Sequence, residues 1–178
     1  MLLRNAVFVF NLLCGACIFP SSASALMLGL STDKLTGDAY LIVTGSVEDT
    51  ESHWTPDNKT IMTTALLSIR EVLKGRIAGK KIQVMYPGGQ VNGIGMMVSD
   101  EVLLHKGEQV LLFLSKETRF SGGAAFRISG RAQGKYTIGE DMIARKRGFS
   151  AAAGAEHIDN NLHIDLLKEK IRACVEEK

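Results

Sequence analysis

Alternation of apolar and polar residues divides the first half of the chain into predicted strands. In the segment 59–73, every second position carries a residue suited to a strand face: Ile61, Thr63, Ala65, Leu67 and Ile69. This period of two is typical of a half-buried strand. Segments 40–54 and 82–86 have the same character. Because residues 55–58, Thr-Pro-Asp-Asn, are typical of a turn, the pattern predicts a long hairpin followed by a third strand.

The second half of the chain predicts one central strand and two shorter ones. Residues 110–114, Val-Leu-Leu-Phe-Leu, are apolar on both faces, which is typical of a strand buried on both sides. Segments 124–130 and 135–139 predict further short strands, and segment 140–161 is expected to be irregular.

Helices are predicted at both ends of this strand region. Ser31 or Thr32 can cap a short helix that Gly37 ends. Near the C-terminus, apolar residues fall on one helical stripe, for which Asn160 or Asn161 is the expected cap: Leu162, Leu166, Leu167 and Ile171.

These elements predict a mainly β fold. About six or seven strands with short connections favour antiparallel pairing. We therefore expect a small antiparallel OB-like barrel with a short N-terminal helix and a C-terminal helix. The expected division is a barrel domain over 26–150, then a linker and the C-terminal helix over 151–178.

The first residues have the order of an export signal. An arginine near the start is followed by an apolar run over 6–19 and by Ala-Ser-Ala at 23–25. This predicts a cleaved signal peptide over 1–25, because the run is too short to span a bilayer comfortably. The mature chain is then periplasmic or extracellular, with no membrane span. An alternative is a lipoprotein processed at Cys17.

Composition narrows the function classes. Hydrophobic residues make up 46% of the chain, which is enough for a packed core. The net charge is +2 without any long basic run, so no nucleic-acid partner is predicted. After signal cleavage Cys174 is the one cysteine left, so the core must hold the fold without an internal disulfide.

The glycine-rich stretch after Pro87 is predicted to be a loop between strands. A phosphate-binding loop needs Gly-Lys-Ser or Gly-Lys-Thr entering a helix, and neither follows here. The loop could still be a contact surface, since its apolar residues and methionines are adaptable.

Trp54, at the predicted hairpin tip, has two interpretations. It could anchor a partner, or it could fold back onto the barrel rim. With its neighbour and the glycine loop it forms the candidate binding surface: Trp54, His53, Gly88, Gly89, Gly93, Ile94, Met96 and Met97.

Catalytic, metal and cofactor sites are not predicted. The four histidines, His53, His105, His157 and His163, lack the spacing of a ligand pair on one helix or strand. Two alternatives remain. One is a metal-dependent or hydrolytic enzyme that uses His53 or His105 with Asp100 or Glu101. The other is a carbohydrate-binding module in which Trp54 and Tyr86 stack on sugar rings.

Four segments come in an order that resembles a known family: EVLKG at 71–75, PGGQVNG at 87–93, GEQVLLFL at 107–114 and QGK at 133–135. The family consists of exported, mostly bacterial proteins of unknown function. In some relatives the domain accompanies secreted metalloproteases, so the resemblance implies a protein partner, with a secreted protease as one candidate.

A more distant similarity is to OB barrels of the netrin and metalloprotease-inhibitor type. Those inhibitors chelate the protease zinc through an N-terminal cysteine held in a disulfide. The mature chain here is predicted to begin at Leu26, so that mechanism does not carry over. The sequence thus predicts an exported, non-enzymatic module that binds a protein in the envelope or secreted fraction.

Overall fold

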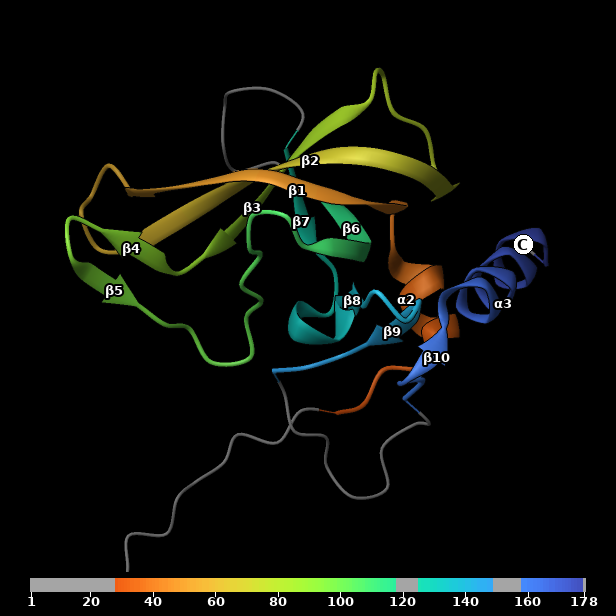
Figure 1. Cartoon of the computed structure of the whole chain (residues 1–178). Helices are drawn as coiled ribbons and strands as arrows, with labels where there is room; N and C mark the ends of the chain where they lie inside the picture. Colours follow the sequence, from red (N-terminus) through yellow and green to blue (C-terminus); the bar gives the residue numbers. More distant parts are fainter. Residues whose placement is uncertain (1–27, 118–124, 149–157, 178) are drawn as a thin grey trace, which may run out of the picture.

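The structure is a computed structural model that describes residues 28–117, 125–148 and 158–177 (Figure 1). The predicted signal peptide over 1–25, the alternative lipid-bearing Cys17 and His157 lie outside the described residues.

Five strands form a closed ring in a mainly β fold. They are β1 (Leu41–Trp54), β2 (Ile61–Lys74), β3 (Lys81–Pro87), β6 (Gln109–Glu117) and β7 (Ala125–Ile128). Their order is β1-β2-β3-β7-β6, and β6 pairs back onto β1. The ring is barrel-like, as predicted, and the long β1–β2 hairpin is also confirmed.

One strand pair differs from the predicted antiparallel arrangement. β3 and β7 are parallel, whereas the other strand pairs of the described residues are antiparallel. The reason is topological, because strand direction cannot alternate all the way around a ring with an odd number of strands. At least one parallel pair must close it.

The remaining strands lie outside the ring. β8 (Lys135–Ile138), β9 (Ile143–Arg145) and β10 (Leu162–His163) extend the sheet from β6, and a 3₁₀ turn spans Arg131–Gly134. β4 (Gly89–Val91) and β5 (Ile94–Met96) form a separate two-stranded sheet. β9 and β10 fall in segments predicted to be irregular or helical, so the prediction is wrong there. The two strands pair with residues about twenty positions away, and such pairing leaves no local sequence pattern.

Both predicted helices are present. α2 (Thr32–Asp38) is capped by Ser31, whose side chain accepts from the backbone N–H of Lys34. α3 (Ile164–Glu176) begins later than predicted and is capped by His163. No helix of the described residues is long and apolar enough to cross a membrane.

Asn160 has a different role from the predicted helix cap. Its side-chain oxygen accepts from Lys146 N at 2.8 Å, and its amide donates to Lys146 O at 3.3 Å. The pairing of Leu162 and His163 with β9 keeps the helix from starting earlier. Asn160 therefore joins the chain before α3 to the end of β9.

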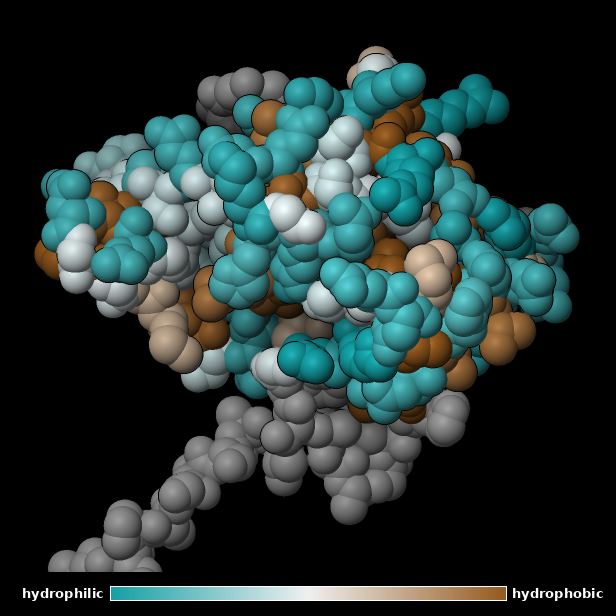
Figure 2. All heavy atoms as spheres, viewed as in Figure 1, coloured by the Kyte–Doolittle hydropathy of each residue, from teal (hydrophilic) through white to brown (hydrophobic). Residues whose placement is uncertain are grey.

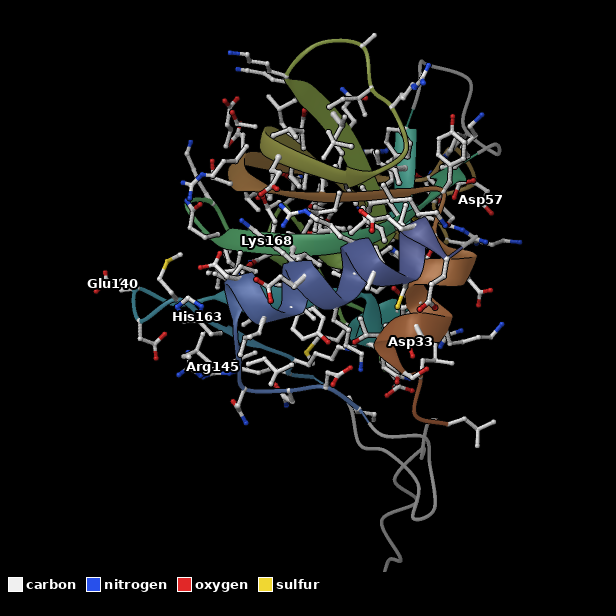
Figure 3. The ribbon with its side chains drawn as sticks, turned by 90° about the vertical axis from the view of Figure 1, so that its right-hand side faces the viewer. Asp33, Asp57, Glu140, Arg145, His163 and Lys168 are labelled. Carbon is white, nitrogen blue, oxygen red and sulfur yellow. The ribbon has the colours of Figure 1, made fainter. Side chains whose placement is uncertain are left out.

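Two apolar cores lie on opposite sides of the sheet. The ring interior contains Val43, Leu67, Val84 and Leu112, among others. On the outer side, α2 and α3 lie next to each other against the sheet (Figures 1 and 3). Their apolar residues pack in one core with Ile42, Leu111, Phe113 and Tyr136. β6 contributes alternate residues to both cores, which confirms the prediction of a central strand that is apolar on both faces.

Candidate functional site

The tip of the β1–β2 hairpin is a fixed turn. Thr55 N donates to Thr60 O at 2.8 Å, and Asn58 N donates to Thr55 O at 2.8 Å. The Thr55 hydroxyl donates to Asp57 Oδ1 at 2.6 Å. This hydrogen bond holds the pKa of the Asp57 carboxyl below its usual value. The tip therefore presents its side chains from an ordered backbone.

The glycine-rich stretch is a hairpin of its own rather than an irregular loop. β4 and β5 are joined by Asn92 and Gly93, which both have positive φ, 50° and 80°. Two successive positive φ values mark the type I′ turn that best fits the twist of a hairpin, and Asn-Gly is its preferred sequence. The dipeptide was visible in the sequence and is the signal that could have predicted this hairpin.

The first two glycines fasten this hairpin to β1 and β2. Gly88 N donates to Ile61 O at 2.8 Å, and Gly88 O accepts from the Thr63 hydroxyl at 2.6 Å. Thr63 in turn shares a hydrogen bond of 2.8 Å with Ser52. A Cβ at Gly89 would collide with both hydroxyls. Gly88 and Gly89 thus let the backbone of this hairpin lie directly against the side chains of β1 and β2.

The outer part of the stretch is exposed and uncharged. We call residues 88–98 the glycine arm, and they contain no Asp, Glu, Lys or Arg. Ile94 is 56% exposed and Met97 is 91% exposed, whereas Met96 is half-buried and its sulfur accepts from Ile61 N at 3.4 Å. Figure 2 shows apolar residues gathered at this end of the molecule, over β5 and the chain that follows it.

The two halves of the predicted surface lie at the same end of the barrel (Figure 1). His53 is exposed and pairs with Met62, while Trp54 is half-buried and pairs with Ile61. Gly93 is exposed at the arm's turn, with open space around it. The structure therefore brings the hairpin tip and the glycine arm together, with Ile61 as their common neighbour.

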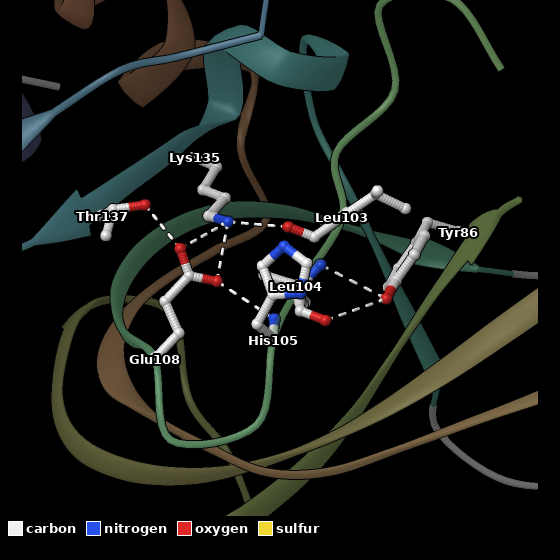
Figure 4. Close-up of polar contacts among 7 residues, drawn as sticks. All are labelled: Tyr86, Leu103, Leu104, His105, Glu108, Lys135 and Thr137. Atoms are coloured by element: carbon white, nitrogen blue, oxygen red, sulfur yellow. Dashed lines mark hydrogen bonds and ion pairs between the residues drawn. The ribbon is translucent and has the colours of Figure 1, made fainter. Parts of the chain in front are cut away.

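A cluster of polar and charged residues lies where β8 meets the chain before β6 (Figure 4). Lys135 Nζ is 2.7 Å from Glu108 Oε1 and donates to Leu103 O at 2.7 Å. Thr137 donates to Glu108 Oε1 at 2.6 Å, and His105 N donates to Glu108 Oε2 at 3.1 Å. The side chains of Lys135 and Glu108 are only 12% and 13% exposed.

This ion pair favours the charged form of the acid. Burial raises the pKa of Glu108, but the hydrogen bonds from Lys135 and Thr137 more than offset it, so the pKa lies below its usual value. Sequence reasoning missed the pair because its members stand 27 residues apart. The only sequence signal is that both belong to segments carrying the family resemblance, GEQVLLFL and QGK.

A cavity of about 440 Å³ next to this pair is lined by Glu101 and His105. Two residues of the alternative enzyme hypothesis therefore share one cavity, whereas His53 lies at the hairpin tip. Burial raises the pKa of Glu101, and Arg131 at 3.7 Å opposes the shift. Within the described ranges, no group of three or more His, Cys, Asp or Glu could hold a metal ion.

Tyr86 is not placed to stack on a sugar. Its ring is buried in the barrel core, and its hydroxyl donates to Leu104 O and accepts from Leu104 N, both at 3.3 Å. Of the two aromatic residues in the carbohydrate hypothesis, only Trp54 reaches the surface.

No protein-family model matches the chain, and no curated protein matches it either.

Proposed function

We propose that the chain is an exported, non-enzymatic binding module that binds another protein through the hairpin tip and the glycine arm. The observation that carries this proposal is the uncharged arm with exposed Ile94 and Met97. Apolar side chains grouped on a surface are typical of protein interaction sites. A secreted protease is one candidate partner, on the family resemblance.

The way the arm is attached also supports binding. The hydrogen bonds of Gly88 with Ile61 and Thr63 fix the arm before any partner arrives. Binding through a preorganised surface loses less conformational entropy than ordering a free loop would. Methionine side chains at the same place can adapt to the partner's shape.

The cavity beside Glu108 supports an enzyme less well. The carboxylate oxygens of Glu108 are engaged by Lys135, Thr137 and the His105 backbone. A general base needs a free lone pair within reach of its substrate. The arm, by contrast, leaves its side chains open to a partner.

The test is affinity capture followed by mass spectrometry. The bait is the chain from the predicted mature start, Leu26, to Lys178, in an extract of the native envelope and secreted fractions. Ile94→Ser/Met97→Ser is expected to lose a partner that the unchanged bait captures. Leu166→Ser is the matched control, since Leu166 is 58% exposed on α3, far from the arm.

The partner is then purified and its affinity measured directly. The arm variant should bind it at least about tenfold more weakly, as expected for removing central apolar contacts. Equal affinities for the arm variant and the Leu166→Ser control would contradict the proposal.

Trp54→Ala separates the two interpretations of that residue. Loss of binding at an unchanged melting temperature would make Trp54 part of the contact surface. A large fall in melting temperature would instead show that its half-buried ring supports the barrel rim.

A further inference from the structure

A second concave surface lies away from the glycine arm, beside the connection from β2 to β3. It is a cavity of about 580 Å³, within the usual range for small-molecule sites. Its apolar lining includes Tyr40, Ile77, Ile82 and Phe126. This surface takes no part in the binding proposed above.

Two aromatic rings make one wall of this cavity. The rings of Tyr40 and Phe126 stack with centroids 6.4 Å apart and planes 22° apart. Tyr40 is 46% exposed, and Lys116 Nζ lies 4.2 Å from the centroid of its ring. The ammonium lies over the face of the Tyr40 ring, so this wall of the cavity carries a positive charge.

The charges around the cavity are mostly positive. Arg76, Lys81 and Lys116 line it, and Glu117 is the one acid among the described residues that line it. Lys81 already pairs with Glu48 at 2.6 Å. Arg76 and Lys116 make no ion pair with any residue that the structure describes. Arg76 and Lys116 are therefore available to pair with an anion next to the apolar lining.

We propose that this cavity binds an amphiphile with an anionic head group and an apolar chain. The chain lies against Ile77, Ile82 and Phe126, where burial of its methylene groups favours binding. The carboxylate or phosphate head lies between Arg76 and Lys116. A cationic or neutral head would gain nothing from these two side chains, so the site selects by charge.

The experiment is isothermal titration calorimetry on the full mature chain. The probes are laurate and dodecyltrimethylammonium, both below their micellar concentrations, so that only the head group differs. We expect saturable binding of laurate at one site, at least about tenfold tighter than the cationic probe. Equal binding of both probes, or no binding of laurate, would overturn the proposal.

Variants assign the binding to this cavity. Arg76→Gln/Lys116→Gln should weaken laurate binding roughly tenfold, as expected for loss of two partly exposed ion pairs. Lys59→Gln/Arg147→Gln is the matched control, because it removes one Lys and one Arg that are exposed elsewhere. If both double variants lose the same affinity, the effect comes from net charge and the site assignment is wrong.

An experiment with vesicles distinguishes a free amphiphile from a lipid in a membrane. Sedimentation with phosphatidylglycerol vesicles is compared with phosphatidylcholine vesicles. Binding to free laurate alone supports a free amphiphile, and binding to anionic vesicles that the Arg76/Lys116 variant abolishes supports a lipid head group at a membrane surface. Vesicle binding that is unaffected by this variant would overturn the cavity as the contact.

Discussion

Two lysines with little exposed side chain differ in how their charge is compensated. Lys135, on β8, has Glu108 at 2.7 Å and Leu103 O as a further acceptor. Lys146, under the helical layer, is 4% exposed, and its ammonium finds no hydrogen-bond partner among the described residues. It lies 4.6 Å from the centroid of the Tyr136 ring instead.

The surroundings of Lys146 explain its chemistry. Burial lowers its pKa to about 8, Asp159 opposes the shift, and Lys170 adds to it. Asp159 is held by Lys170 at 2.7 Å, so the nearby carboxylate is shared with a competing cation. Removing one member of the Lys135–Glu108 pair would leave the other charge without its partner. Lys146, by contrast, is an ammonium whose burial costs free energy.

The largest expected loss of stability follows from removing the carboxylate that pairs with Lys135. Glu108→Gln leaves the largely covered ammonium of Lys135 without a counter-charge and should lower the free energy of unfolding by about 3 kcal/mol. Urea unfolding followed by circular dichroism measures this. Glu108→Gln/Lys135→Met should recover most of the loss, because no unpaired charge remains. A loss below about 1 kcal/mol for the single variant would show that water reaches the pair.

A change of stability in the opposite direction is expected at Lys146. Lys146→Met removes a buried ammonium and keeps a flexible apolar side chain, so the free energy of unfolding at pH 7 should rise by about 1–2 kcal/mol. The same urea titration measures it. A destabilised variant would mean that the contact with Tyr136 outweighs the cost of burial, and the comparison of the two lysines would fail.

The pH dependence of stability tests the same difference. Lys146 has a pKa of about 8 in the folded chain and about 10.4 when unfolded. Between these values the unfolded chain binds more protons, so this group's contribution to the free energy of unfolding increases as pH rises. The advantage of Lys146→Met over the unchanged chain should therefore shrink by on the order of 1 kcal/mol between pH 7 and pH 9. An advantage constant over that range would contradict the shift.

The smallest effect concerns the network around Glu108. Thr137→Val keeps the shape of the side chain but removes its 2.6 Å hydrogen bond to Glu108. Its cost should be about 1 kcal/mol or less, since Lys135 and the His105 backbone still hold the carboxylate. Thermal unfolding measures it, with Thr64→Val as the control, because half-buried Thr64 makes no side-chain hydrogen bond within the described part of the chain. A cost as large as that of Glu108→Gln would mean that Thr137, rather than Lys135, keeps the acid charged.

The sequence allowed prediction of those elements whose pattern is local. Alternation along β2, apolarity on both faces of β6 and the cap at Ser31 were all readable from neighbouring residues. The Asn92-Gly93 turn is equally local, since Asn-Gly is the preferred sequence of a two-residue hairpin turn. The loop prediction for the glycine-rich stretch is wrong where β4 and β5 pair.

Features that depend on distant segments could not be predicted. The approach of Lys135 to Glu108 and the stacking of Tyr40 on Phe126 need the ring to close first. The same holds for the pairing of β9 with β10, two short strands that are distant in the sequence. Of the candidate site, the exposed tip and arm were predictable as surface, but their shared contact with Ile61 was not.

The parallel pair that closes the ring also has a consequence for how the chain folds. β1, β2 and β3 are consecutive hairpins, so each can pair soon after its neighbour. Among the described residues, the β3–β7 seam pairs Gln83 with Ala125 and Val84 with Phe126, and it joins segments about forty residues apart. Because non-local closure costs chain entropy before it gains contacts, we expect this seam to form late and to exchange its amide hydrogens early. Phe126 and Gln83 also line the cavity assigned to the anionic amphiphile. A bound amphiphile would therefore stabilise the β3–β7 pair that closes the ring.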